Sequence, residues 1–370
     1  MDQLYIPRVG ITLIPGIGNV LAKQLISYCG SAEKVFNTPR NKLLKIPGIG
    51  IKIADSIRKS IQLEKAENIV KQCSRSGIRI LYFTDQDYPS RLKDLYDSPV
   101  ILYGKGKGNL NPEKSIGIVG TRRATVYGKS TVEEIIREMK YHNPTIISGL
   151  AYGIDYRSHV SALAHDLPTI GVIAGGYRHL YPALHKRTAL EMEITGSIIS
   201  ESAPDIIPEA HFFPERNRII AGMSDVLVVV EAALKGGALI TAEYANNYNR
   251  EVFALPGNIH SRFSEGCNNL IRKHKAHILT SVKDIEYIMN WSREGPPAVQ
   301  TAQKEIDWSD LSIPEKKIIQ IFKNSGNEIL IDELSWKSQI PVNQLASHLL
   351  NLEFRGYIKA LPGKKFRFKE

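Results

Sequence analysis

Short apolar runs of strand length alternate with stretches long enough for helices between residues 114 and 257, and this alternation restricts the fold more than any other feature. The run 225–230 is apolar after its first residue, which is typical of a strand that is buried on both faces. Strands that alternate with helices indicate an α/β fold with a doubly wound parallel sheet. The predicted strands are 115–120, 145–148, 169–173, 196–200, 225–230 and 251–255, with helices over 131–139 and up to Leu163.

The ends of these strands carry glycines together with basic and polar side chains. Ligands of parallel α/β sheets bind outside the carboxyl ends of the strands. Glycines there let backbone N–H groups approach a phosphate closely, and arginine makes bidentate phosphate contacts. Since no segment has the Rossmann GxGxxG pattern with its downstream acid, or the P-loop pattern, we expect neither a nicotinamide dinucleotide nor P-loop ATP hydrolysis. The strand-end residues are Gly120, Thr121, Arg122, Arg123, Ser148, Gly149, Gly153, Gly175, Gly176, Glu231 and 235–242.

The sequence Ile-Pro-Gly-Ile-Gly occurs twice near the start of the chain, at 14–18 and 46–50, and an amphipathic stretch follows each copy. This pattern resembles a tandem helix–hairpin–helix. Backbone N–H groups at the start of each second helix would then hold a phosphate, aided by the helix dipole. A purely structural helical module without DNA contact is the alternative. The predicted accessory phosphate contacts are Gly16, Gly18, Lys23, Gly48, Gly50 and Lys52.

The C-terminal part of the chain has the pattern of a small separate module. Residues 291–310 are polar, contain Pro296-Pro297 and predict a linker. Beyond them, helix starts at 313, 331 and 341 and a hairpin around Pro362-Gly363 resemble a winged helix. The third of these helices has no lysine or arginine between 341 and 352, which favours a protein-binding or accessory role over DNA reading.

Positive charge is concentrated in the two flanks. The net charge is +10, with 48 Lys and Arg against 38 Asp and Glu, and it divides into +7 for residues 1–85, zero for 86–309 and +3 for 310–370. A basic flank attracts nucleic acid, although solubility alone is an equal explanation. The three cysteines are far apart, which argues against a disulfide framework or a zinc site and fits a reducing cytoplasm. We find no signal peptide, and no apolar run is long enough for a membrane span.

The segment 212–222 places two aromatic residues ahead of two arginines and an apolar helix. Aromatic rings stack on bases and arginines neutralise phosphates. From composition alone, a core role for Phe212 and Phe213 with ion pairing of Arg216 is the stronger interpretation. Candidate catalysts are few: Asp155 and His159 share a helix face, but such a pair is usually structural, and no metal spacing or nucleophile arrangement is present. We therefore expect no metal and no enzyme activity.

Taken together, these motifs resemble the DNA processing protein A family (DprA, also called Smf), whose order they follow across residues 85–280. The motifs are 118–122, 148–155 with His159, 181–182, 199–201, 213–222, 241–242, 256–257 and 269–271. The resemblance implies an extended Rossmann-like core with accessory N-terminal and winged C-terminal modules. The predicted domains are a helical domain at 1–84, the core at 85–290, the linker at 291–310 and a winged-helix-like domain at 311–370.

The resemblance also implies a function. Members bind single-stranded DNA, dimerise through the core and load the recombinase RecA onto incoming DNA during natural transformation, overcoming single-strand binding protein; they are not regarded as enzymes and need no cofactor. The family's pocket arginine corresponds to Arg122, and the base-stacking phenylalanine to Phe213. The pocket also uses a lysine, for which Lys186 is the nearest candidate. The predicted DNA-binding residues are Gly120, Thr121, Arg122, Arg123, Ser148, Gly149, Gly153, Lys186, Phe213, Arg216, Asn217 and Arg218.

Two other interpretations remain open at this point. Rossmann-like nucleotide phosphoribohydrolases have comparable glycine-rich strand ends and a glutamate near a GG-x-x-T run, which Glu231, Gly236-Gly237 and Thr241 could mimic. The third interpretation is a scaffold whose flanks bind other proteins. The chain also departs from the family in having Lys235-Gly236-Gly237-Ala238 before its Thr-Ala pair, a difference that would alter one loop.

Overall fold

The computed structural model describes residues 2–59, 61–291, 308, 311–325, 328–361 and 365–368. These residues form two compact units, Met1–Arg293 and Glu294–Glu370. Most of the predicted linker 291–310 and the hairpin tip at Pro362-Gly363 lie outside the described residues.

A nine-stranded sheet is the centre of the first unit, with the strand order β1-β2-β6-β5-β4-β3-β7-β8-β9. The strands from β3 to β9 pair in parallel, whereas β1 and β2 add an antiparallel edge. The chain builds β3 to β6 in one direction and then crosses to the other side of β3 for β7 to β9, so the sheet is doubly wound as expected. The strands are β1 (Arg79–Tyr82), β2 (Ile101–Gly106), β3 (Ser115–Val119), β4 (Thr145–Ser148), β5 (Thr169–Ile173), β6 (Ser197–Ser200), β7 (Val226–Val229), β8 (Glu251–Ala254) and β9 (His277–Ile278).

Three of these strands, β1, β2 and β9, are not predicted from the sequence, and all three lie at or near the edges of the sheet. Residues 79–82, which the sequence interpretation places in the N-terminal helical segment, form β1. This strand is buried on two of its four residues only, so it lacks the continuous apolar run that identifies the central strands. Strand β9 has two exposed residues and no apolar pattern at all.

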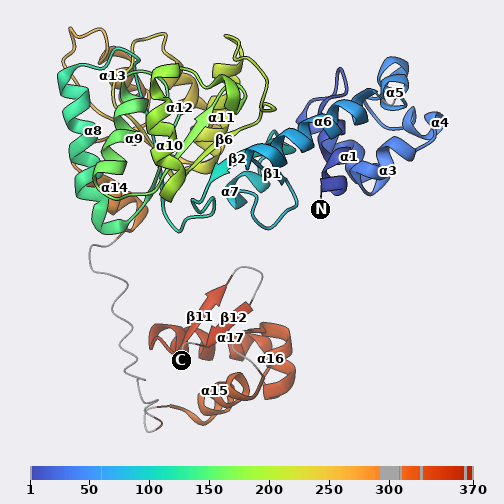
Figure 1. Cartoon of the computed structure of the whole chain (residues 1–370). Helices are drawn as coiled ribbons and strands as arrows, with labels where there is room; N and C mark the ends of the chain where they lie inside the picture. Colours follow the sequence, from blue (N-terminus) through green and yellow to red (C-terminus); the bar gives the residue numbers. More distant parts are fainter. Residues whose placement is uncertain are drawn as a thin grey trace. The chain divides into compact units, whose positions relative to one another are not determined.

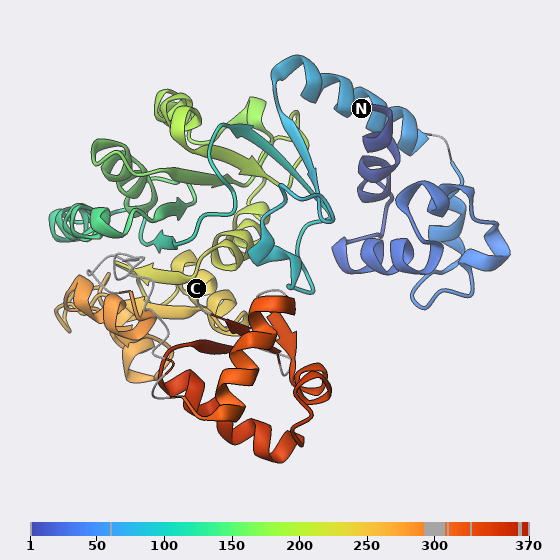
Figure 2. The same ribbon diagram turned by 90° about the horizontal axis from the view of Figure 1, so that it is seen from below.

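Helices cover both faces of the sheet, and the side chains of the strands alternate between them. Val226 and Val228 pack with α8 and α14, whereas Leu227 and Val229 pack with α11 and α12. In Figure 2 the green helices lie along one side of the strands and the yellow helices along the other. The helices on the first face are α8 (Val126–Met139), α9 (Ile154–Ala164), α10 (Lys186–Thr195) and α14 (Val282–Met289); those on the second are α11 (Phe212–Met223), α12 (Gly237–Asn247) and α13 (Glu265–Arg272).

The N-terminal segment has the two predicted helix–hairpin–helix motifs (Figure 1). Gly16 and Gly48 have φ values of +83° and +82°, a backbone region that favours glycine and gives the tight hairpin. Gly18 and Gly50 then cap the second helix of each motif. The helices are α1 (Asp2–Thr12), α2 (Asn19–Cys29), α3 (Ala32–Asn37), α4 (Arg40–Leu43), α5 (Ile51–Ile57) and α6 (Ile61–Ser76), followed by α7 (Ser90–Lys93).

The second unit has the helices and hairpin of a winged helix. The predicted hairpin strands β11 and β12 pair antiparallel, and β10, which the sequence interpretation lacks, pairs with β12. Within the part of the chain that the structure describes, no helix is long and apolar enough to cross a membrane. The elements are α15 (Ile313–Ser325), β10 (Glu328–Leu330), α16 (Ile331–Ser338), α17 (Val342–Phe354), β11 (Ile358–Leu361) and β12 (Lys365–Phe368).

Candidate nucleic-acid interface

A cavity of about 690 Å³ lies at the carboxyl ends of β3 and β7, where the chain reverses its direction across the sheet. This is the position at which doubly wound sheets bind ligands. Among the lining residues, Arg122, Arg123, Lys235 and Arg262 are exposed and basic, while Asp155 is the one acidic residue of the set. The cavity is therefore electropositive although the charges of residues 86–309 sum to zero.

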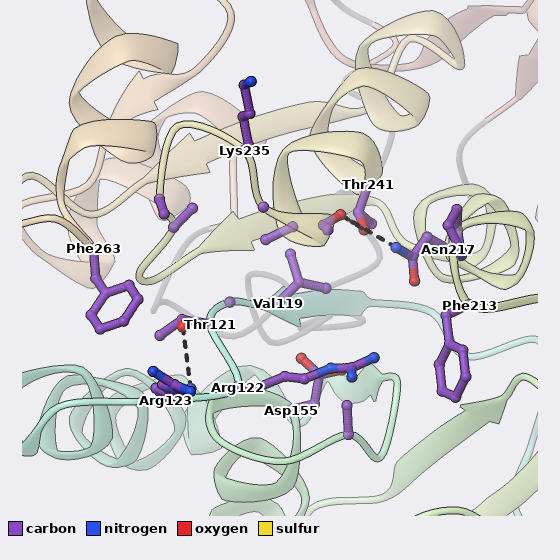
Figure 3. Close-up of a pocket in the computed structure, with 18 of the residues that line it drawn as sticks. Val119, Thr121, Arg122, Arg123, Asp155, Phe213, Asn217, Lys235, Thr241 and Phe263 are labelled. Carbon is purple, nitrogen blue, oxygen red and sulfur yellow. Dashed lines mark hydrogen bonds between the residues drawn. The ribbon is translucent and has the colours of Figure 1, made fainter. Parts of the chain in front are cut away.

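The loop after β3 forms one wall of the cavity, and backbone hydrogen bonds to neighbouring segments hold it in place. The Thr121 amide donates to the Glu231 carbonyl at 2.7 Å, and the Ile154 amide donates to the Thr121 carbonyl at 3.2 Å. The Arg123 amide donates to the Thr121 hydroxyl at 3.2 Å (Figure 3). These contacts hold Arg122 and Arg123 at the rim with exposed side chains.

Gly153 supports the same loop by backbone contact. It has a φ of +80°, and a Cβ on it would overlap the carbonyl oxygen of Thr121. We therefore expect Gly153→Ala to lower the free energy of unfolding by at least about 2 kcal/mol, measured by urea denaturation. Gly77→Ala is the matched control, because Gly77 also has a positive φ but no atom within 4 Å of the place that a Cβ would take. Equal losses in the two variants would contradict the packing role of Gly153.

Phe213 and Phe263 lie on opposite sides of the cavity (Figure 3). Arg122 extends toward Phe213, and its guanidinium carbon lies 5.1 Å from the centre of the Phe213 ring. A guanidinium over an aromatic face gains cation–π attraction, which holds both groups in place. The arrangement puts a phosphate-binding cation beside a ring on which a base could stack.

Arg216 and Asp155 are buried side chains of opposite charge at the cavity wall, and they attract each other without a direct ion pair. Arg216 is 6% exposed, and its Nη1 donates to the carbonyls of Gly149, at 2.6 Å, and Val172. It thus joins the ends of β4 and β5. Burial lowers the pKa of Arg216 to about 10 although Asp155 opposes the shift. Burial also raises the pKa of Asp155, against the attraction of Arg216 and the amides of Ala151 and Gly120. Arg216 reaches the cavity wall, but its hydrogen bonds are used inside the protein.

The loop after β7 forms the opposite wall. Gly236 caps α12 without a side-chain hydrogen bond, and Gly236, Gly237 and Ala238 at the start of the helix line the cavity. The Asn217 side-chain amide donates to the Gly237 carbonyl at 3.3 Å and links α11 to α12. Lys235, Arg262 and Phe263 line the cavity, and none of them is among the predicted DNA-binding residues, although Lys235 is one of the strand-end residues. The position of Lys235 beside two glycines at a strand end could have indicated a phosphate contact. Residues 262–263 lie several positions beyond a predicted strand, and no sequence pattern marks them as cavity residues.

The structure does not bring all the selected residues to the cavity. The Ser148 hydroxyl is buried and donates to the Ile118 carbonyl at 2.5 Å. Arg218 points to the other side of α11, where it pairs with Glu201 at 2.5 Å and donates to the Asp97 carbonyl at 2.7 Å. Lys186 is exposed at the start of α10 but does not line the cavity. Lys235, which lines the cavity, is therefore the better candidate for the pocket lysine.

The two helix–hairpin–helix copies differ in their surroundings. Lys23 in the first copy donates to the Ser98 hydroxyl at 2.5 Å and the Leu95 carbonyl at 3.2 Å, and burial lowers its pKa. Asn19, at the start of the same helix, donates to Glu201 at 2.6 Å. In the second copy Gly48, Gly50 and Lys52 are exposed. The first copy is thus packed against the core, and phosphate contact by either copy remains a prediction.

Glu231, the residue on which the phosphoribohydrolase interpretation depends, is buried below the loop. Its carboxylate accepts hydrogen bonds from the Thr125 amide at 2.9 Å and the Thr125 hydroxyl at 2.5 Å, and it does not line the cavity. His159 is also fully buried, with Nδ1 2.7 Å from the Thr169 hydroxyl, and burial lowers its pKa to about 3. Within the described ranges, no group of three or more His, Cys, Asp or Glu residues is placed to hold a metal ion. Glu231 therefore holds Thr125, the N-cap residue of α8, in place.

Comparison with known families bears directly on this fold and site. A family model described as DNA recombination-mediator protein A matches residues 79–290. The chain belongs to this family. Two further models match the flanks: a SAM-like helix-hairpin-helix tandem at residues 11–63 and a DprA winged helix domain at residues 311–364. The resemblance inferred from the spaced motifs is thereby confirmed, and so are the accessory modules.

Relatives of the family cover most of the chain. The DNA processing protein DprA of Bacillus subtilis (strain 168) is 39% identical over 222 residues, which are 60% of this chain and 74% of the relative. Protein Smf of Escherichia coli (strain K12) is 34% identical over 288 residues, or 76% of this chain and 75% of the relative.

Two solved structures of the family are similar to this one. The X-ray structure of DNA processing protein A from Streptococcus pneumoniae has a TM-score of 0.64 at 29% identity, covering 77% of this chain and 96% of that one. DNA processing protein A from Helicobacter pylori, described as having a unique single-stranded DNA binding mode, has a TM-score of 0.52 at 28% identity over 58% of this chain and 95% of that one.

Proposed function

We propose that this protein binds single-stranded DNA in the cavity at the carboxyl ends of β3 and β7. The observation that carries the proposal is the Arg122–Phe213 pair, which sets a guanidinium 5.1 Å from an aromatic ring at the rim of an electropositive cavity. Single-strand binding combines basic grooves with stacking aromatics. The relative from H. pylori, described by its single-stranded DNA binding mode, supports the same ligand.

Within this proposal the two walls of the cavity have different roles. Arg122, Arg123 and the start of α12 hold phosphates, while Phe213 and Phe263 receive bases. Gly120 and Gly153 allow the close packing that keeps the loop after β3 in place. Arg216 joins α11 to the end of β4, and Asn217 joins it to α12. Stacking and phosphate contact carry little sequence information, so we expect low sequence specificity.

We also propose the wider role that the family resemblance implies. The protein protects incoming single strands and loads RecA onto them during natural transformation, in competition with single-strand binding protein. It acts in the cytoplasm as a dimer formed through the core, with residues 1–84, 85–290 and 311–370 as its domains. It is a binding protein that uses no catalytic residue or cofactor, and its helix–hairpin–helix and winged modules are accessory contacts for DNA or protein.

Fluorescence anisotropy with a labelled oligo-thymidylate and a duplex of equal length tests the ligand class. We expect tighter binding to the single strand, and a log affinity that falls with log salt by about 0.7 for each phosphate neutralised. Equal affinity for both ligands, or binding to the duplex alone, would contradict the proposal and would move the DNA contact to the basic flanks.

A further inference from the structure

Aromatic side chains continue away from Phe213 along the sheet's carboxyl edge. The Tyr181 ring lies 5.8 Å from the Phe213 ring, and the Tyr152 ring lies 6.4 Å from the Tyr181 ring, measured between centroids. The three residues follow different strands: Tyr152 follows β4, Tyr181 follows β5, and Phe213 follows β6 at the start of α11. Helix α11 packs against β3, β4 and β5, so Phe213 at its start lies near the cavity although β6 is farther along the sheet. We call Phe213, Tyr181 and Tyr152 the aromatic row.

The rings of the row are oriented so that faces stay open. The interplanar angles are 77° between Tyr181 and Phe213 and 86° between Tyr152 and Tyr181, so neighbouring rings meet edge to face. An edge-to-face contact uses at most one face of a ring on that side. Tyr181 is 48% exposed and Tyr152 is 40% exposed, which are high values for large aromatic residues. The row therefore offers aromatic surface to a ligand.

The far end of the row is rigid. Tyr152 packs against His185, with 5.1 Å between the ring centroids, and Tyr156 stacks on His185 at 4.0 Å. His185 is buried, and its Nδ1 lies 2.8 Å from the Leu150 carbonyl. A ring held in this way loses little conformational entropy when a ligand stacks on it.

Basic side chains stand at both ends of the row. Arg122 lies over Phe213 at the cavity end. At the other end Lys186 is exposed and follows His185 directly in the chain. A row of open rings that begins in an electropositive cavity and ends at a lysine matches one kind of ligand, a polyanion that carries flat bases.

We propose that the aromatic row is a second stacking surface for the same single strand, which leaves the cavity at Phe213 and passes over Tyr181 and Tyr152 toward Lys186. This inference rests on the proposed single-strand binding at the cavity and extends it. It also gives Lys186 a role in phosphate contact outside the cavity. The length of strand that the protein occupies is then set by the row as well as by the cavity.

The test is a length series of oligo-thymidylates, from about 4 to about 20 nucleotides, bound by the full chain and by the Tyr181→Ala/Tyr152→Ala double variant. A strand too short to reach the row should bind both proteins equally. For strands that reach it, the loss of stacking on two rings predicts binding by the variant that is weaker by roughly thirtyfold or more. The Tyr181→Phe/Tyr152→Phe variant keeps the rings and should bind like the parent.

Controls separate this inference from the proposed function. Tyr96→Ala removes a tyrosine that is 75% exposed outside the row and should leave binding at every length unchanged. If the parent binds and Arg122→Ala weakens binding, but the double alanine variant binds all lengths like the parent, the aromatic row proposal is overturned and single-strand binding stands. If the parent does not bind the oligonucleotides, both are overturned. Thermal unfolding of each variant confirms that the fold is retained.

Discussion

Replacing Arg122 by alanine is expected to weaken single-strand binding by roughly ten- to hundredfold. Hydrogen bonds to a charged group contribute about 1.5–3 kcal/mol each, and Arg122 is exposed at the cavity rim where a phosphate would meet it. The change also removes the cation beside the Phe213 ring. Anisotropy titrations at one fixed salt concentration measure the loss. A salt series should show the log–log slope reduced by about 0.7, the share of one phosphate.

The matched control for this prediction is Arg137→Ala. Arg137 lies on α8, and its side chain is 60% exposed with only a surface ion pair to Glu134. It carries the same charge as Arg122 but lies away from the cavity lining. Wild-type affinity in Arg122→Ala would contradict the assignment of the cavity, and an equal loss in Arg137→Ala would mean that overall charge, not the site, controls binding.

Arg216→Ala is expected to have the largest effect on stability. It removes the donor to the Gly149 and Val172 carbonyls and the nearby positive charge that attracts the buried carboxyl group of Asp155. The loss of a charged donor to two buried carbonyls, together with that attraction, is expected to cost about 3 kcal/mol or more. Urea denaturation monitored by circular dichroism measures this loss. Single-strand binding by the variant should fall in proportion to the unfolded fraction.

A double variant separates the buried charge from the lost hydrogen bonds. Adding Asp155→Ala to Arg216→Ala removes the buried carboxyl group that has lost its neighbouring cation and should recover part of the stability. Arg187→Ala, whose side chain is 92% exposed, should change stability by less than about 1 kcal/mol. A loss below about 1 kcal/mol in Arg216→Ala, with weakened DNA binding in a fully folded protein, would show that Arg216 contacts DNA directly.

The sequence predicts the central sheet well because buried parallel strands have a strong signal. Runs such as Val226–Val229 are apolar on both faces and begin and end close to the predicted positions. The glycine-rich strand ends then place Arg122 and the α12 start at one edge by topology alone. The edge strands β1 and β9 have short or exposed patterns, so periodicity does not identify them.

The directions of individual side chains are harder to predict from sequence. Arg216 and Arg218 are two positions apart on α11, so they point to different sides of the helix: one enters the core and the other pairs with Glu201. Lys23 and Lys52 both lie on the second helix of their repeat, yet Lys23 is half-buried against the core and Lys52 is exposed. These differences depend on what packs against each helix, which no local pattern records.

Photo-cross-linking tests the central claim most directly. A short oligonucleotide that carries 5-iododeoxyuridine is bound to the full chain and irradiated, and the cross-linked peptide is identified by mass spectrometry. We predict a cross-link at Phe213 or at another aromatic residue of the cavity, and its loss in Arg122→Ala at the same oligonucleotide concentration. Cross-links confined to residues 2–59 or to the winged-helix unit, with none in the cavity, would contradict single-strand binding at the carboxyl ends of β3 and β7.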